Sequence, residues 1–142
     1  MPAVERVETF KAPIESVYEA IIDFESYPDF VDGVEEIKIL KKTKKKLKVQ
    51  YTVNMIKVAT YVIEVTLDEP NGISWKLVSG DFFKKNSGYW ALEEISAKKT
   101  EVTYGLDVEF KIFAPKMVVN KLVKTSLPLM MKSFHKKAKS IK

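Results

Sequence analysis

Apolar and polar residues alternate through most of the middle of the chain. Leu47, Val49 and Tyr51 alternate with polar neighbours, and the same two-residue period recurs in later segments. Successive side chains of a strand point to opposite faces of a sheet, so this pattern predicts antiparallel strands with one buried and one solvent-facing side. The predicted strands cover residues 3–11, 34–42, 46–56, 58–68, 73–77, 86–96 and 102–110.

Two helices are predicted between the first and second strands. In residues 14–22 the apolar side chains recur at steps of three and four residues, which is typical of an amphipathic helix. Residues 23–30 are rich in aromatic side chains and predict a second, very short helix, with Ser26 as its cap and Pro28 in its first turn.

A long helix is predicted from about Pro115 to residue 140, where apolar residues again follow a helical stripe. Pro128 lies inside this helix, and we expect it to kink or loosen the helix near residues 124–128. The stripe contains Val119, Leu122, Val123, Ser126, Met130 and Phe134.

The predicted order is one strand, two helices, about six strands and a long helix, which favours a single α+β domain over residues 1–142. Six or seven antiparallel strands present one broad apolar face, and the long helix is the element available to cover it. The sheet must twist and curl around that helix. Because one helix does not fill so wide a concave face, we expect a cavity between the sheet and the helix.

Five large aromatic residues share the parity of the predicted buried face. Tyrosine and tryptophan each combine a large apolar surface with one hydrogen-bonding group, so a pocket lined by them suits an amphipathic, hydrophobic small molecule. The simpler interpretation is that each of them is an ordinary core residue. The predicted lining of the pocket is Tyr51, Tyr61, Trp75, Trp90, Tyr104, Leu122, Val123, Ser126 and Met130.

The formal net charge is +5, and six of the eight residues in "KKTKKKLK" are lysine. Such a cluster attracts anionic surfaces. The partner that we consider for this lysine cluster is an anionic membrane surface, which the cluster would contact transiently. Nucleic acid is not favoured as a partner. The alternative is a solvated hairpin tip, since lysine also protects sheet edges from aggregation. The cluster comprises Lys41, Lys42, Lys44, Lys45, Lys46 and Lys48.

The sequence offers little catalytic or metal-binding chemistry. It contains no cysteine, and its one histidine, His135, lies near the end of the predicted last helix, where a positive charge is favourable. One histidine with scattered carboxylates predicts neither a metal site nor a catalytic triad, and no cofactor is expected. There is no signal-peptide pattern and no apolar run of about 18 residues, so we expect a cytoplasmic protein.

Four stretches in a fixed order carry a family resemblance: "VYEAIIDFESYPDFVDGVEEIKIL", "SGYWALEEI", "TEVTYGLDVEF" and "LMMKSFHKKAKSI". They resemble the START/Bet v 1-like (SRPBCC) superfamily, in particular the polyketide cyclase/dehydrase-like branch that includes the coenzyme Q-binding START-domain proteins. The resemblance implies a helix-grip fold, in which a curved antiparallel sheet wraps around a long C-terminal helix. It also implies that the aromatic residues Phe24, Tyr27 and Phe30 close one end of the cavity.

One departure separates this chain from the coenzyme Q-binding members, which commonly continue the Tyr-Pro-x-Phe motif with proline and then Trp-Cys. Here the motif is followed by Val31, Asp32 and Gly33. The resemblance therefore implies the broader lipid-binding branch and leaves quinone specificity open.

Three functions follow from the resemblance and the residues together. The leading hypothesis is non-enzymatic binding or transport of a hydrophobic small molecule, such as a lipid, a quinone or a polycyclic compound. The second is an aromatic polyketide cyclase or dehydratase that uses pocket tyrosines as acids. The third is a toxin-like family member that interacts with ribosomes or RNA.

Overall fold

The computed structural model describes residues 3–54, 58–81, 83–110 and 127–141. They form a seven-stranded antiparallel sheet in the order β1-β7-β6-β5-β4-β3-β2, together with helices on one of its faces. The strands are β1 (Ala3–Phe10), β2 (Val34–Lys42), β3 (Lys46–Asn54), β4 (Val58–Asp68), β5 (Gly72–Gly80), β6 (Phe83–Ser96) and β7 (Lys99–Phe110). The helices are α1 (Ile14–Ile22), the 3-10 helix η1 (Phe24–Ser26), α2 (Tyr27–Phe30) and α4 (Leu127–Ser140).

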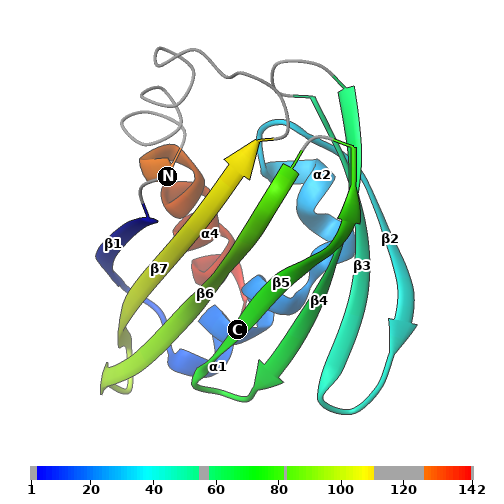
Figure 1. Cartoon of the computed structure of the whole chain (residues 1–142). Helices are drawn as coiled ribbons and strands as arrows, with labels where there is room; N and C mark the ends of the chain where they lie inside the picture. Colours follow the sequence, from blue (N-terminus) through cyan, green and yellow to red (C-terminus); the bar gives the residue numbers. More distant parts are fainter. Residues whose placement is uncertain (1–2, 55–57, 82, 111–126, 142) are drawn as a thin grey trace.

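The α+β helix-grip architecture expected from the sequence is confirmed. Strands β2 to β7 pair in sequence order, and β1 returns to pair with β7, so that Phe10 lies opposite Thr100. The sheet curves around the helices on its concave side (Figure 1). Strands β5 and β6 are longer than the alternation indicated, because β5 stays paired with β4 as far as Gly80 opposite Tyr61, and β6 pairs with β7 from Phe83 opposite Phe110 onward. The single-domain organisation over residues 1–142 stays a prediction.

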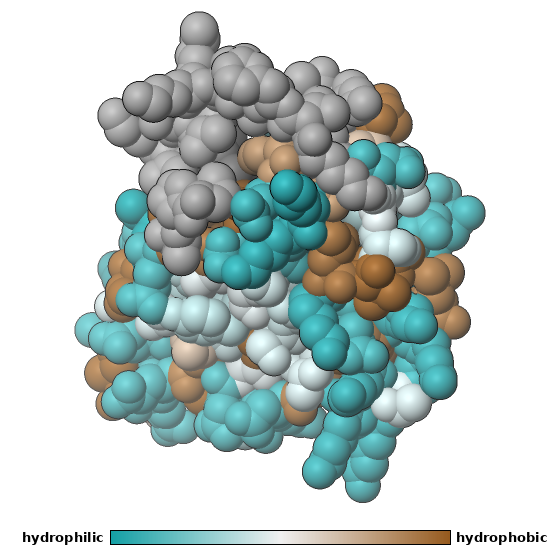
Figure 2. Space-filling model, in the orientation of Figure 1, coloured by the Kyte–Doolittle hydropathy of each residue, from teal (hydrophilic) through white to brown (hydrophobic). Residues whose placement is uncertain are grey.

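The core lies between the concave face and the helices. Val17 and Ile21 of α1 and Met131 and Phe134 of α4 are at most 2% exposed. Helix α1 packs against α4, and the inner residues of the strands close the core from the other side. The outer face of the sheet is mostly hydrophilic with separate apolar patches (Figure 2). Burial follows the alternation in the sequence most regularly along β3, where every second residue from Leu47 to Val53 is buried.

The short aromatic segment closes one end of the fold. Tyr27 is buried, and its hydroxyl donates a hydrogen bond to the carbonyl of Ile21. Its ring packs edge-on against Phe30 and Phe134, with centroid distances of 5.8 and 5.2 Å. Because this contact joins α2 to α4, the segment fixes the position of the helix that lies in the concave face.

Two expectations for the helices need comment. Ser26 holds the N-cap position of α2, but its hydroxyl donates to the Asp23 carboxylate at 2.7 Å and makes no cap bond, so the predicted capping role is wrong. Pro28 does lie in the first turn of α2. For α4, the expected start near residue 115 and most of the predicted kink region lie outside the described residues.

The expectation that His135 supplies a favourable positive charge is wrong. Its Nε2 atom accepts a hydrogen bond from the backbone N–H of Lys11 at 2.9 Å, which requires that this nitrogen carries no proton. Its ring stacks on Phe10 at 4.7 Å with an interplanar angle of 4°. Burial, and then the positive charges of Lys139 and Lys11, lower the pKa of His135, with Glu8 opposing them. Neutral His135 thus fastens α4 to the end of β1.

This contact predicts a pH dependence of stability. Because the pKa of His135 in the folded protein lies below its ordinary value of 6.5, the contribution of His135 is complete above about pH 6.5 and is lost as pH falls through the folded-state pKa. Urea unfolding of the wild type and of His135→Phe, which keeps the stacked ring, should give free energies whose difference shrinks or reverses as pH falls from neutral. Carboxylates titrate in both proteins, so a difference that is independent of pH would contradict the contact.

A candidate ligand cavity

A cavity of about 350 Å³ lies between the concave face of the sheet and helices α2 and α4. Most of its walls are aromatic and aliphatic side chains. Near α2 its wall includes the segment Val31–Val34, and on α4 it is lined by Met130 and Phe134. The sheet contributes Tyr51, Val53, Asn54, Tyr61, Ile63, Ile73, Trp75, Phe83, Asn86, Trp90, Tyr104, Leu106, Val108 and Phe110.

The structure brings together six of the nine residues predicted from the sequence to line a pocket. Five of them come from five different strands and share the inward parity that the alternation indicated, and the sixth comes from α4. The six are Tyr51, Tyr61, Trp75, Trp90, Tyr104 and Met130. The other three, Leu122, Val123 and Ser126, lie outside the described residues. A ligand-binding role for any of the nine stays a prediction.

Cross-strand neighbours build the aromatic wall. Tyr51 pairs with Tyr61 in the β3–β4 register, and their rings stack at 5.0 Å with an interplanar angle of 9°. Trp90 pairs with Tyr104 in the β6–β7 register, and their ring centroids are 4.7 Å apart. Directly opposed residues on one face of an antiparallel sheet are close enough for their rings to touch. The wall is therefore a consequence of register, which the strand pattern alone does not give.

Trp75 is directed into the cavity by a glycine on the neighbouring strand. Gly88 lies opposite Trp75 in the β5–β6 register, and a Cβ atom there would lie 2.5 Å from the indole ring. The indole therefore lies over Gly88, and its Nε1 donates a hydrogen bond to Oδ1 of Asn86 at 3.2 Å. Asn86 is only 6% exposed. Its amide and the indole N–H form a polar group within a largely apolar wall.

Asn86 is the main site residue that sequence reasoning missed. It shares the parity of Trp90 and Leu92 on β6, so a polar residue at an inward position was the available signal. Tyr27, which was expected to close one end of the cavity, also lines it. Phe83, Phe110 and Phe134 line the cavity as well and were not among the predicted lining residues.

Four cavity tyrosines remain protonated at neutral pH. Burial is the first cause that raises the pKa of each. The four are Tyr27, Tyr51, Tyr61 and Tyr104. They act as neutral hydrogen-bonding groups and not as bases. Within the described ranges, no cluster of three or more histidine, cysteine, aspartate or glutamate residues is arranged to hold a metal ion.

The model of the polyketide cyclase / dehydrase and lipid transport family matches residues 10–135 of the chain. The chain belongs to this family. Curated family relatives include the ribosome association toxin RatA of Escherichia coli K12, which is 25% identical over 142 residues, covering 99% of this chain and 89% of RatA. The persistence and stress-resistance toxin PasT of E. coli O6:H1 has the same identity and coverage.

Solved structures show the same fold. The Zhui aromatase/cyclase from Streptomyces sp. R1128 has a TM-score of 0.85 at 18% identity, with 97% of this chain and 93% of that chain covered. A START superfamily protein from Mycobacterium smegmatis also has a TM-score of 0.85, at 21% identity and 99% coverage of both chains. The START-like resemblance read from the sequence is confirmed. Among the helices that the structure describes, none is long and apolar enough to span a bilayer.

Trp90 tests whether the aromatic wall is packed core. It is 4% exposed and contacts Tyr104 and Phe134, so Trp90→Ala should lower the free energy of unfolding by roughly 3–5 kcal/mol. Ile95 lies on the same strand but is 54% exposed, so Ile95→Ala should change the free energy of unfolding by less than about 1 kcal/mol. Denaturant melts measure both. An equal, small loss in the two variants would show that the indole is not packed as described.

Proposed function

We propose that this protein binds and carries an apolar small molecule in the cavity without altering it chemically. The observation that carries the proposal is the composition of the cavity wall, which is aromatic and aliphatic except for a few neutral polar groups and the exposed Asp32. The volume of about 350 Å³ falls at the lower end of the range typical of small-molecule sites. Burial of apolar surface would drive uptake, so binding should depend little on salt.

The comparisons support this proposal at the level of the family. The family description names lipid transport beside cyclase and dehydrase activity, and a START superfamily protein has the same fold. A lipid, a polycyclic compound and a quinone all suit an aromatic wall of this kind. Quinone specificity stays a prediction, because the residues that follow the Tyr-Pro-x-Phe motif differ from those of the coenzyme Q-binding members.

A second candidate is an aromatic polyketide cyclase or dehydratase, which the aromatase/cyclase fold neighbour makes relevant. Its supporting observation is the group of neutral tyrosines, since a phenol can donate a proton to a ligand oxygen. The pKa values of these phenols are all raised, which suits them to hydrogen bonding and makes them weak acids. We therefore favour the carrier. A cyclase would release a product of altered mass, whereas a carrier returns its ligand unchanged.

Filling the cavity tests the carrier. Met130 of α4 lines it, whereas the adjacent Leu129 is 57% exposed on the same helix. Met130→Trp should place a large ring in the cavity and strongly reduce uptake of Nile red, while Leu129→Trp, the matched control, should leave uptake unchanged. Thermal melts would confirm that both variants unfold cooperatively. Normal dye uptake by a folded Met130→Trp variant would count against the cavity as the binding site.

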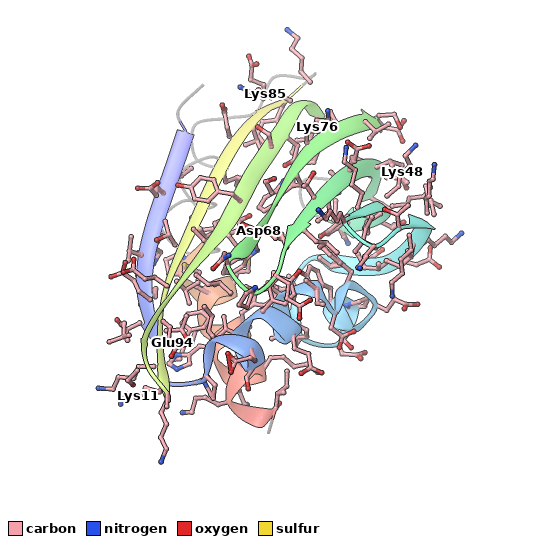
Figure 3. The ribbon with its side chains drawn as sticks, turned by 90° about the horizontal axis from the view of Figure 1, so that it is seen from below. Lys11, Lys48, Asp68, Lys76, Lys85 and Glu94 are labelled. Atoms are coloured by element: carbon pink, nitrogen blue, oxygen red, sulfur yellow. The ribbon has the colours of Figure 1, made fainter. Side chains whose placement is uncertain are left out.

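The β2–β3 hairpin carries the net charge of the whole chain. Residues 34–54 contain seven lysines and two glutamates, a sum of +5, which equals the formal net charge of the full sequence. Lys41, Lys42, Lys44 and Lys45 are exposed, and no ion pair joins them to another described residue, whereas Lys46 approaches Glu64 at 3.7 Å. In Figure 3, Lys48 of this hairpin lies far from Lys11 and Glu94 at the other end of the molecule.

We propose that this hairpin contacts an anionic membrane surface transiently, where an apolar ligand would be collected or delivered. Its lysines complement acidic headgroups, and Leu40, half-exposed among them at 50%, offers an apolar side chain to the interface. The RatA likeness raises a ribosomal partner as the alternative occupant of the same surface. The exposed residues of the hairpin tip include no aromatic side chain on which bases stack, so we favour the membrane. A cytoplasmic location stays a prediction.

Charge removal separates these outcomes. Replacing Lys42, Lys44 and Lys45 with glutamine should weaken binding to phosphatidylserine-containing vesicles at low salt by about tenfold or more, given about 1 kcal/mol per lysine near such a surface. Replacing the exposed Lys84, Lys98 and Lys99 removes the same charge elsewhere and serves as the control. Co-sedimentation measures both.

Three results would count against the membrane contact. They are absence of vesicle binding at low salt, equal losses in the two triple variants, and binding to ribosomal RNA but not to vesicles.

A further inference from the structure

The two edge strands of the sheet differ in how well they are protected from pairing with another chain. Strand β2 has two register shifts in its ladder with β3, ends in Lys41 and Lys42, and is contacted by η1 and α2. Bulges, lysines and covering elements all protect an edge strand in this way. Strand β1, at the opposite edge (Figure 1), pairs with β7 without a register shift and contains no lysine, proline or glycine. The less protected edge is therefore β1.

The outer edge of β1 has backbone groups available for another strand. Outside the ladder with β7, no backbone group of residues 4–9 bonds to another described residue. In an antiparallel strand the N–H and C=O groups of alternate residues point to alternate sides, so half of those in β1 point away from β7. At the middle of the strand, the side chain of Val7 is 52% exposed. A regular, unpaired edge of this kind is a template for strand pairing.

The sequence of β1 is complementary to itself in one antiparallel register. When two identical edges pair about a two-fold axis, residues with outward-pointing backbone groups must face each other, so the axis passes through one residue position. An axis at Glu5, Arg6 or Glu8 would set that charge against its own copy. An axis at Val7 instead sets Val7 against Val7 of the second copy. It also sets Arg6 of each copy against Glu8 of the other.

Arg6 and Glu8 are already arranged for these contacts. They lie on the same face of β1, and Nη2 of Arg6 is 2.7 Å from Oε2 of Glu8. Their side chains are 42% and 38% exposed, so a second copy can reach them. In the register centred on Val7, the four charges alternate in sign along each strand and across the pair. Opposite charges that face each other stabilise strand pairing, and like charges oppose it.

We propose that the protein self-associates through β1 as a two-fold dimer, in which the two sheets join into one continuous sheet centred on Val7. The partner is a second copy of this chain, because the charges of β1 complement those of the same strand. The β2–β3 hairpin lies at the far edge of each sheet and remains free for the surface contact proposed above. The dimer goes beyond the carrier function and does not depend on it.

A single introduced thiol tests the contact at the axis, because the chain contains no cysteine. Facing residues of an antiparallel pair have Cα atoms about 4.5–5.5 Å apart, a separation that a disulfide spans. Oxidation with diamide should therefore convert most of the Val7→Cys variant to a covalent dimer on a non-reducing gel. Val78→Cys is the matched control, since Val78 is 47% exposed on the interior strand β5, and it should stay mostly monomeric.

Charge reversal tests the register. Sedimentation velocity of the wild type over a dilution series should show a concentration-dependent shift from the 16.3 kDa chain to twice that mass. Arg6→Glu and Glu8→Arg each turn two attractive cross-strand pairs into two repulsive ones, so each variant alone should self-associate about tenfold more weakly. An equimolar mixture of the two variants should associate as the wild type does, because each copy then supplies the charge that the other requires.

Each result decides for or against the dimer. A wild type that stays monomeric throughout the series would overturn it, as would equal cross-linking of the two cysteine variants. Dimers that survive both charge reversals would show that β1 is not the interface, and a monomeric mixture would overturn the register centred on Val7. Thermal melts verify that the variants are folded. Nile red uptake should be unchanged in all of them, so a failure of the dimer leaves the carrier function intact.

Discussion

The mismatch between a wide curved sheet and the described helices that cover it determines the rest of this structure. Seven strands present one apolar face, and α1, α2 and α4 pack against it without filling it. Large aromatic side chains bridge the remaining distance, because rings are the largest apolar groups that a strand position supplies. Trp90 shows the result, since its ring reaches both Tyr104 on the next strand and Phe134 on α4. The space between the sheet and the helices that these rings do not occupy forms the cavity.

The same constraint explains why the polar chemistry of the cavity is so restricted. A charged group at an inward position would lose its hydration, and a neutral polar group needs a partner. Asn86 satisfies this requirement through Trp75, and the phenols remain protonated because burial disfavours their ions. The cavity therefore offers neutral donors in an apolar wall, which suits recognition of a weakly polar ligand better than proton abstraction from it.

The alternation of apolar residues was enough to predict the strands, the buried face and the order of elements, because it reflects which side of each strand meets water. It was enough to select Tyr51, Tyr61 and Trp75, whose parity is inward. The alternation does not predict contacts between segments that are distant in sequence. His135 was expected to be charged, but the backbone N–H of Lys11, 124 residues away in the sequence, donates a hydrogen bond to its ring nitrogen. Asn86 was missed for the same reason, since its partner Trp75 comes from a neighbouring strand whose register the sequence does not state.

Native mass spectrometry of the protein, purified under non-denaturing conditions from cells that naturally express it, tests the central claim most directly. The account predicts a mass excess that corresponds to one organic molecule per chain, that is lost on denaturation, and that is identified as an apolar compound. The bare mass of the chain at every collision energy, in protein that also takes up no apolar compound when one is offered, would contradict the account.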